Sequence, residues 1–387
     1  MTTVKTFDST MSGAPVLSGT AGALINVVKT CLVDGFGAGA VQALSVSGGV
    51  ATATYATSHP FRVGSIALFA GATPSALNGQ KGVLSVTSTT ITFDATGVAD
   101  GAATGSITSQ LASAGWSQVF SGTNLSALKP SVVEATGCVL RIDDSGTTNA
   151  RVRAFESMSD INTGLGPTPM DSQVSGGLWW PKSNAASSAA RPWVLVADAR
   201  GFYLGVDVQG AGRFTLLFAG DIASLKSGDA YGYVITGNQS DQTTISTVPD
   251  GCCGWSHRSA RGGAYMVRAH TGIGQAIAAQ RVGAHHNGTT ADVYSGTAGY
   301  GFGSYPNGAN NGLMVGALEV FGTSIRGTLP GLWHAVQAME DVFSSLGFVD
   351  GTDDLQGRRL MALRTAPPAG SVTPGTVWLD TTGPWSR

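Results

Sequence analysis

Histidine and acidic side chains could hold a metal ion, and one adjacent histidine pair stands out. His285 and His286 are neighbours in the chain. On a strand, neighbouring side chains point to opposite faces, so the pair could chelate one ion only from a loop. A trimer could alternatively bring copies of one histidine onto its axis. We interpret the pair as part of a solvated loop and predict no metal site.

The segment Asp350-Gly-Thr-Asp-Asp354 is the second candidate, because its oxygen ligands alternate as they do in calcium-binding loops. It then departs from the EF-hand pattern. Leu355 stands where a glycine is required, and Met361 stands at the position of the bidentate glutamate. A polar turn is therefore the expected structure, and the sequence predicts no cofactor.

Glu156 and Asp160 are the carboxylates that could serve glycoside hydrolysis, and they precede the aromatic pair Trp179-Trp180. Their separation in space does not follow from the sequence. The same two indoles, together with Trp193, could instead stack on sugar rings. The third alternative is that these aromatic side chains fill a core or an interface.

Motifs for nucleotide binding and nucleophilic catalysis are missing. The sequence has no G-x-x-x-x-G-K-[ST] loop and no G-x-S-x-G, and Gly35 to Ala40 lack the glycine spacing of a dinucleotide site. We therefore predict that the chain is not an enzyme and has no catalytic residue.

The composition points to a weakly charged chain of two or three units. Its 387 residues are 42% hydrophobic and only 12% charged, with a net charge of -2 and 55 glycines. Without a run of Lys or Arg, we expect no nucleic-acid binding. The first residues lack the apolar core of a signal peptide, and no stretch reaches 18 consecutive apolar residues. We therefore expect neither export nor membrane insertion, and synthesis in a cytoplasm. The four cysteines do not form a disulfide framework, and Cys252-Cys253 are expected to be reduced thiols.

An amphipathic helix is predicted between Ser18 and Gly37, with Gly35 at its C-terminal cap. Because a short helix is marginally stable alone, its apolar stripe must pack on the next domain or dock on a neighbouring subunit. The stripe consists of Leu24, Val27, Val28, Cys31 and Leu32.

Beyond the helix the apolar residues alternate with period two, which is typical of strands. We predict a mainly β fold with four units: an N-terminal arm and helix (1–40), a small β-barrel or sandwich module (41–112), a larger β-sandwich-like domain (113–330) and a C-terminal extension (331–387). In that extension, 331–340 could be a short helix or extended. A Pro/Gly linker then leads to a docking strand over 376–380.

The module resembles small β-modules that recur in phage tail and baseplate proteins. The resemblance rests on Gly49–Ser65, Leu77–Val86 and Thr89–Phe93, which show an alternating Val/Thr strand, a His-Pro-Phe turn, a Val-Gly turn and a Leu-Asn-Gly loop. Ser65 replaces the acidic residue usual in that pattern, and Pro60 replaces a common glycine.

Four further segments, which together span most of the chain, are Phe7–Gly22, Ala154–Met158, Gly177–Asn184 and Ile325–Leu332. In these segments the chain resembles a widespread family of uncharacterised virion proteins of tailed bacteriophages. This resemblance implies a structural component of the tail tip or baseplate, located in the virion and assembled in the bacterial cytoplasm. Its expected partners are copies of itself, as a trimer rather than a hexamer, and other tail proteins. The alternative is a tail protein that binds a host receptor or a carbohydrate.

Overall fold

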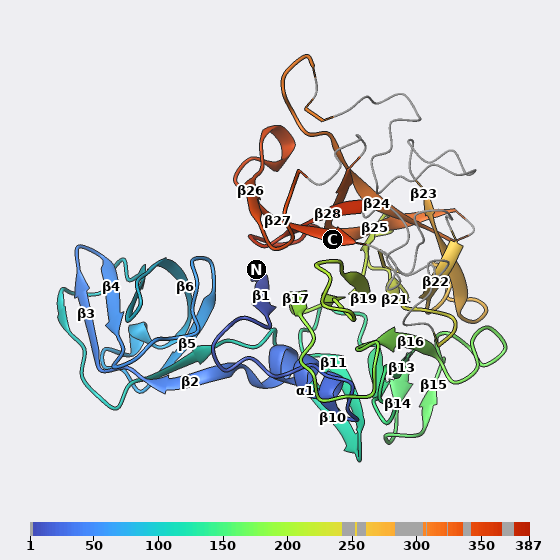
Figure 1. Cartoon of the computed structure of the whole chain (residues 1–387), viewed down its shortest axis with the longest axis horizontal. Helices are drawn as coiled ribbons and strands as arrows, with labels where there is room; N and C mark the ends of the chain where they lie inside the picture. Colours follow the sequence, from blue (N-terminus) through green and yellow to red (C-terminus); the bar gives the residue numbers. More distant parts are fainter. Residues whose placement is uncertain are drawn as a thin grey trace.

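The computed structural model of the chain (Figure 1) describes residues 3–241, 252–253, 261–282, 305–306, 308–322, 324–335, 342–365 and 375–387. Strands account for 46% of it and helices for 6%, which confirms the expected mainly β fold with one short helix. Three sheets carry the architecture: a curved eight-stranded sheet at the left of Figure 1, and a thirteen-stranded and a five-stranded sheet that pack on each other among the described residues.

The eight-stranded sheet forms a separate β-module over residues 36–111 (Figure 1). Five of its strands alternate between buried and more exposed residues, and the Phe69 and Phe93 ring centroids lie 4.8 Å apart inside it. In spatial order the strands are β2 (Phe36–Ala40), β9 (Thr108–Leu111), β5 (Ile66–Ala70), β6 (Gly79–Val86), β7 (Thr90–Asp94), β4 (Val50–Thr54), β3 (Ala43–Ser47) and β8 (Gly101–Ala102), with the 3-10 turn η2 (Ser75–Leu77) between β5 and β6.

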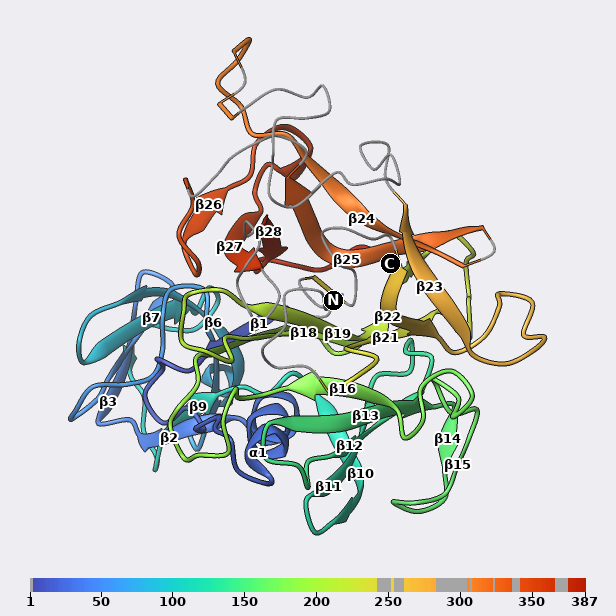
Figure 2. The ribbon, with the colours of Figure 1, turned by 45° about the vertical axis from the view of Figure 1, so that its right-hand side comes forward.

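A five-stranded antiparallel sheet forms the outer layer of the main body, the lower layer in Figure 2. A two-stranded hairpin, β14 (Ser157–Met158) with β15 (Gly164–Leu165), extends from it. The order of the five strands is β10 (Trp116–Gly122), β11 (Leu125–Pro130), β12 (Val139–Asp143), β13 (Asn149–Phe155) and β16 (Leu178–Pro181).

The largest sheet has thirteen strands among the described residues and curls into a half-barrel. Its end strands are β1 and β26, and each pairs on one side only. The order is β1 (Lys5–Asp8), β17 (Trp193–Ala197), β18 (Gly201–Val206), β19 (Thr215–Asp221), β21 (Tyr233–Thr236), β22 (Arg261–Met266), β23 (Ile277–Val282), β24 (Val315–Phe321), β25 (Ile325–Ala335), β28 (Gly375–Asp380), β27 (Arg359–Thr365) and β26 (Phe348–Asp350); β20 (Ala223–Ser224) pairs with β25, and η3 (Asp353–Leu355) is a 3-10 turn.

The thirteen-stranded and five-stranded sheets of the main body share a core in which Phe202 of β18 is central. The rings of Trp116 and Trp180, which belong to the five-stranded sheet, meet Phe202 edge-on at 5.5 and 5.9 Å. Every residue of β17, β18 and β19 is buried, because the five-stranded sheet covers one face and the rest of the half-barrel covers the other.

The structure corrects the expected boundary at residue 331. That boundary falls inside β25, a continuous strand up to Ala335, and residues 336–340 lie outside the described residues. Pro330 is tolerated within the strand because the pairing with β24 shifts register there. The expected docking strand is β28, which lies between β25 and β27 inside the large sheet, so it is not a free arm.

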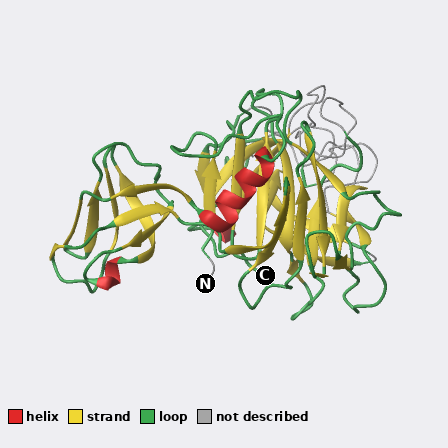
Figure 3. Cartoon of the chain, turned by 90° about the horizontal axis from the view of Figure 1, so that it is seen from below, coloured by secondary structure: helices red, strands yellow, loops and turns green. Residues whose placement is uncertain are grey.

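The predicted helix is α1 (Ala23–Lys29), which continues as a π-helical turn, η1 (Thr30–Asp34), and packs on the main body (Figure 3). Gly35 ends it with φ +76°, and its N–H donates to the Thr30 carbonyl. The helix has no cap of its own, because Gly22 at its N-cap has no side chain.

Asp144, from the loop after β12, provides the missing cap. One carboxylate oxygen accepts the N–H groups of Leu24 at 2.7 Å and Ile25 at 3.2 Å. The other accepts a bond from the Lys182 ammonium, and both side chains are 0% exposed. Lys182 also donates to the Thr20 carbonyl at 2.7 Å, so one buried ion pair joins the helix start to the ends of β12 and β16.

Replacing Lys182 tests this junction. Lys182→Met leaves the Asp144 carboxylate buried without its counter-ion, and we expect the free energy of unfolding in urea to fall by about 3–5 kcal/mol. The control is Lys29→Met, which removes an ion pair with Asp34 whose side chains are 33% and 44% exposed. The control substitution should lower the free energy of unfolding by less than about 1 kcal/mol, because an exposed ion pair contributes little. Equal losses in the two variants would contradict the central role of the buried pair.

Candidate interaction site

The apolar stripe of the helix is fully buried within this chain. Leu24, Val27, Val28, Cys31 and Leu32 are all 0% exposed and belong to the core that fills the main body. Of the two alternatives, packing on the chain itself is the observed one, and the stripe is not a docking surface for a neighbouring subunit. All four cysteines are buried as free thiols, including Cys252 and Cys253.

The structure also contradicts sugar stacking by Trp180 and Trp193, which are 0% and 1% exposed. Each indole N–H is used internally: Trp180 donates to the Thr236 carbonyl at 2.6 Å and Trp193 to the Pro15 carbonyl at 3.0 Å. Both side chains are core residues, which was the third alternative for these aromatic residues.

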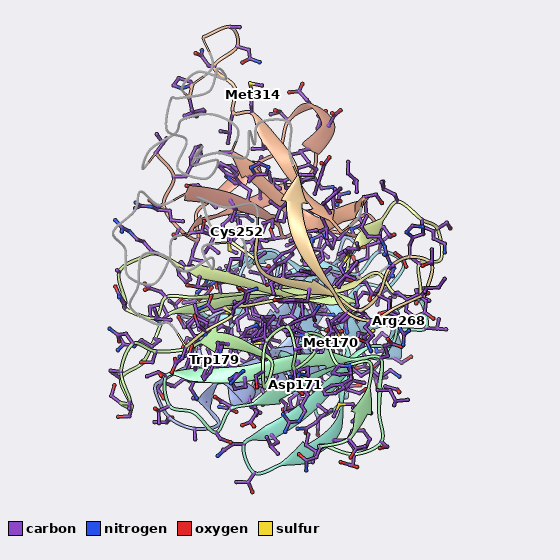
Figure 4. The ribbon with its side chains drawn as sticks, turned by 90° about the vertical axis from the view of Figure 1, so that its right-hand side faces the viewer. Met170, Asp171, Trp179, Cys252, Arg268 and Met314 are labelled. Carbon is purple, nitrogen blue, oxygen red and sulfur yellow. The ribbon has the colours of Figure 1, made fainter. Side chains whose placement is uncertain are left out.

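Trp179 is the exception, because it is half-buried and points to the outer face of the five-stranded sheet (Figure 4). The Arg151 guanidinium, opposite it on β13, stacks 3.8 Å from the ring centroid and donates to the Gly177 carbonyl at 2.6 Å. One face of the indole is thus occupied by a cation.

Arg151 belongs to a group of arginines on this outer face that hold the connection from β13 to β16. Arg141 donates to the Ile161 carbonyl at 2.7 Å, and Arg153 donates to Asp171 at 2.6 Å. Asp171 also accepts the Gly176 N–H at 2.9 Å. The bond from Arg153 and that backbone bond lower the pKa of Asp171 to about 2.

The proposed hydrolytic carboxylates lie in different settings. Glu156 forms an ion pair with Arg268 from the strand-connecting loop after β22. Asp160 is exposed at a turn, where its bond from the Asn162 N–H lowers its pKa. A general acid needs the opposite shift, towards neutral pH. Asp160 therefore does not have the properties of the acid in a hydrolytic pair.

The metal candidates give no site within the described residues. His285 and His286 lie outside them, and no group of three His, Cys, Asp or Glu side chains among the described residues could hold an ion. Asp350 lies on β26 opposite Arg359, and Asp353 begins the turn η3. The expected polar turn is therefore present. In the same part of the chain, no helix is long and apolar enough to span a membrane.

Four large aliphatic side chains are exposed on loops and at the strand ends that border them, and we call this set the loop-tip cluster. Leu165 is 72% exposed, Leu225 74%, Ile273 77% and Ile325 44%. Single exposed aliphatic side chains are ordinary, whereas a group on adjoining loops is typical of a contact surface.

Polar contacts hold these loops together. The Leu225 N–H donates to the Arg326 carbonyl at 2.9 Å, and the Arg326 guanidinium binds Asp229 at 2.6 Å. Arg268, labelled in Figure 4, pairs with Glu156, whose N–H donates to the Leu165 carbonyl. Lys226 donates to the His270 carbonyl at 2.9 Å. These contacts join the four segments that carry the exposed side chains.

A second feature is a mostly apolar cleft of about 350 Å³, which we call the seam cleft. It lies where β1, the module loop 62–66 and the strands β26 and β27 meet. Val63 and Phe348 line it and are 47% and 44% exposed. Arg62 crosses from the module to Asp8 at 2.5 Å, and Arg359 lies 4.4 Å over the Phe348 ring. Sequence patterns could not reveal this cleft, because its walls come from distant segments.

No protein-family model matches the sequence, and no curated protein is significantly similar to it.

The low pKa of Asp171 gives a pH test of the arginine-held loop. In the unfolded chain an aspartate titrates near pH 3.9, roughly. Since the folded pKa is lower, about 2, the carboxylate stabilises the loop above the unfolded pKa and loses this effect as pH falls towards 2. Carboxyl NMR titration should find that midpoint. In Arg153→Gln the midpoint should rise towards the unfolded value; an unchanged midpoint would contradict the assigned cause.

Proposed function

We propose that this chain is a structural component of a bacteriophage tail tip or baseplate, where it holds copies of itself and other tail proteins together. The observation that carries the proposal is the loop-tip cluster: four aliphatic side chains, 44–77% exposed, on segments that ion pairs and hydrogen bonds join. Burying such side chains against a partner removes apolar surface from water, which drives association.

Two further observations support it. Only 12% of the residues are charged, and Lys182, Arg326 and Arg387 lie in ion pairs with side chains no more than 6% exposed. Few charges are therefore left for the surface, which favours coverage by partner proteins. The β-module over 36–111 folds from the segments that resemble phage tail modules.

Locating the chain in the particle tests this function. Mass spectrometry of virions of the phage that encodes it should detect the chain. In sedimentation experiments, a purified sample should form a closed oligomer, which we expect to be a trimer. A non-structural protein of the same phage serves as the negative control. A chain that is absent from intact virions and stays monomeric at high concentration would overturn the proposal.

Variants of the loop-tip cluster sharpen the test. Leu225→Asp combined with Ile273→Asp should reduce incorporation into virions about tenfold or more, because a buried carboxylate at an apolar interface is strongly unfavourable. Val133→Asp, at a residue that is 92% exposed and outside the cluster, should leave incorporation unchanged.

A second candidate function is carbohydrate binding at the host surface, which Trp179 alone still favours. Its indole is half-buried and has Arg151 on one face, so a sugar ring could stack on the other. Trp179→Ala should abolish binding of the wild-type chain to host surface polysaccharide, measured by biolayer interferometry. The matched control is Trp333→Phe, in another part of the chain. Absence of binding by the wild type would remove this candidate.

A further inference from the structure

Among the described residues, strand β1 pairs only with β17, so its other edge is open where it borders the seam cleft. On the paired side, the Ser9 N–H donates to the Trp193 carbonyl at 3.0 Å. In an antiparallel pair the residues that bond to the partner alternate with residues whose backbone groups point away from it. Given the register, Thr6 and Asp8 turn their N–H groups towards the open side.

Thr6 and Asp8 also line the cleft. The Asp8 carbonyl is already used, since it accepts the Met11 N–H at 3.2 Å. The Thr6 hydroxyl is buried without a hydrogen-bond partner in the described chain. Buried polar groups are normally paired, so these groups point to a missing hydrogen-bonding partner on this side of the strand.

The opposite wall is the other end of the same sheet. Phe348 of β26 and both Arg359 and Met361 of β27 line the cleft, and β26 pairs only with β27. The half-barrel therefore stops at two end strands that border one apolar space of about 350 Å³. A space of this size is suited to a few residues of extended chain.

Three charged residues line the cleft, namely Arg62, Arg359 and Asp8, so the walls carry one more positive than negative charge. Asp8 is 5% exposed and already bound by Arg62, whereas the Arg62 side chain is 44% exposed. The excess favours a partner with a carboxylate.

We propose that the seam cleft binds an extended, acidic segment of another tail protein, which adds as a strand to the open edge of β1. The backbone of the segment pairs with Thr6 and Asp8, alternate apolar side chains contact Val63, Phe348 and Met361, and a carboxylate lies near Arg62 and Arg359. Strand addition of this kind takes its affinity from main-chain hydrogen bonds and its specificity from alternate side chains. The inference rests on the proposed function, and names the kind of partner that one of its surfaces accepts.

The test uses the full-length chain and a fluorescein-labelled probe peptide, Glu-Val-Thr-Val-Thr-Val-Glu, with blocked ends. Fluorescence anisotropy should show binding about tenfold tighter than for the same peptide with lysines in place of glutamates. Methylating alternate backbone nitrogens of the probe should abolish binding, because strand pairing needs the N–H groups. Hydrogen exchange at the Thr6 and Asp8 amides should slow when the probe is bound.

Variants on the exposed rim separate this site from others. Phe348→Asp and Arg359→Glu should each weaken the probe about tenfold or more, while Leu165→Asp, at a residue 72% exposed in the loop-tip cluster, should have no effect. Circular dichroism melts confirm that each variant folds, and Phe348→Leu should retain binding.

Three outcomes would overturn the inference: equal affinity for the acidic and basic peptides, unchanged exchange at β1, or no effect of Phe348→Asp. Self-association in sedimentation experiments that Phe348→Asp abolishes would assign the cleft to a second copy, and would also overturn it. If the peptide does not bind, the inference about the seam cleft is wrong, but the chain can still be found in virions and the proposed function stands. If the chain is absent from virions, the proposed function is wrong even when the peptide binds.

Discussion

The buried ion pair between Asp144 and Lys182 is the contact on which the arrangement of the main body depends. An unpaired charge at 0% exposure would be strongly unfavourable, so each residue requires the other. Asp144 also provides the helix cap that Gly22 does not supply, and carboxylates are favourable at a helix N-terminus. Since Lys182 directly follows β16, placing it also places Trp180 against Phe202, between the two large sheets.

Buried ion pairs also join distant segments to the large sheet at two other places. Asp198, in the turn between β17 and β18, binds Arg387 at the end of the chain, with side chains 0% and 4% exposed. Asp229 binds Arg326 beside β25, at 2% and 6% exposure. Apolar contact is not directional and tolerates many arrangements, whereas an ion pair withdrawn from water requires one partner at one position. These pairs therefore specify how segments far apart in the sequence meet, and they use charges that would otherwise lie on the surface.

Local patterns predicted the elements well, because alternation and helical spacing are properties of neighbouring residues. The helix stripe, the Gly35 cap, the module strands and β12, β13, β17 and β18 all follow from such patterns. Local patterns did not predict which distant segments these elements pair with or pack against. The partner of Asp144 is 38 residues away and leaves no periodic signal, and β28 looked like a free arm because its partners β25 and β27 could not be recognised. Trp180 and Trp193 were ambiguous for the related reason that the groups covering them come from distant segments: Phe202 packs on Trp180, and the Pro15 carbonyl accepts the Trp193 indole N–H.

An open sheet edge exposes a protein to unwanted pairing, so its presence at β1 needs a physical account. Part of that account is that the β-module lies beside this edge. Arg62 reaches from the module to Asp8 and Thr10 and keeps the loop 62–66 beside the edge, where it narrows the approach. At the base of the module, Gly13 and Gly37 lie so close that a Cβ added at Gly13 would stand 3.3 Å from the Gly37 Cα. A Cβ added at Gly37 would meet the Pro60 ring at 2.5 Å. The module is therefore held close to β1 at two places, and its position controls which chains can reach the edge. A narrow cleft with a positive excess excludes flat, neutral edges of other sheets while it still admits a single extended acidic segment.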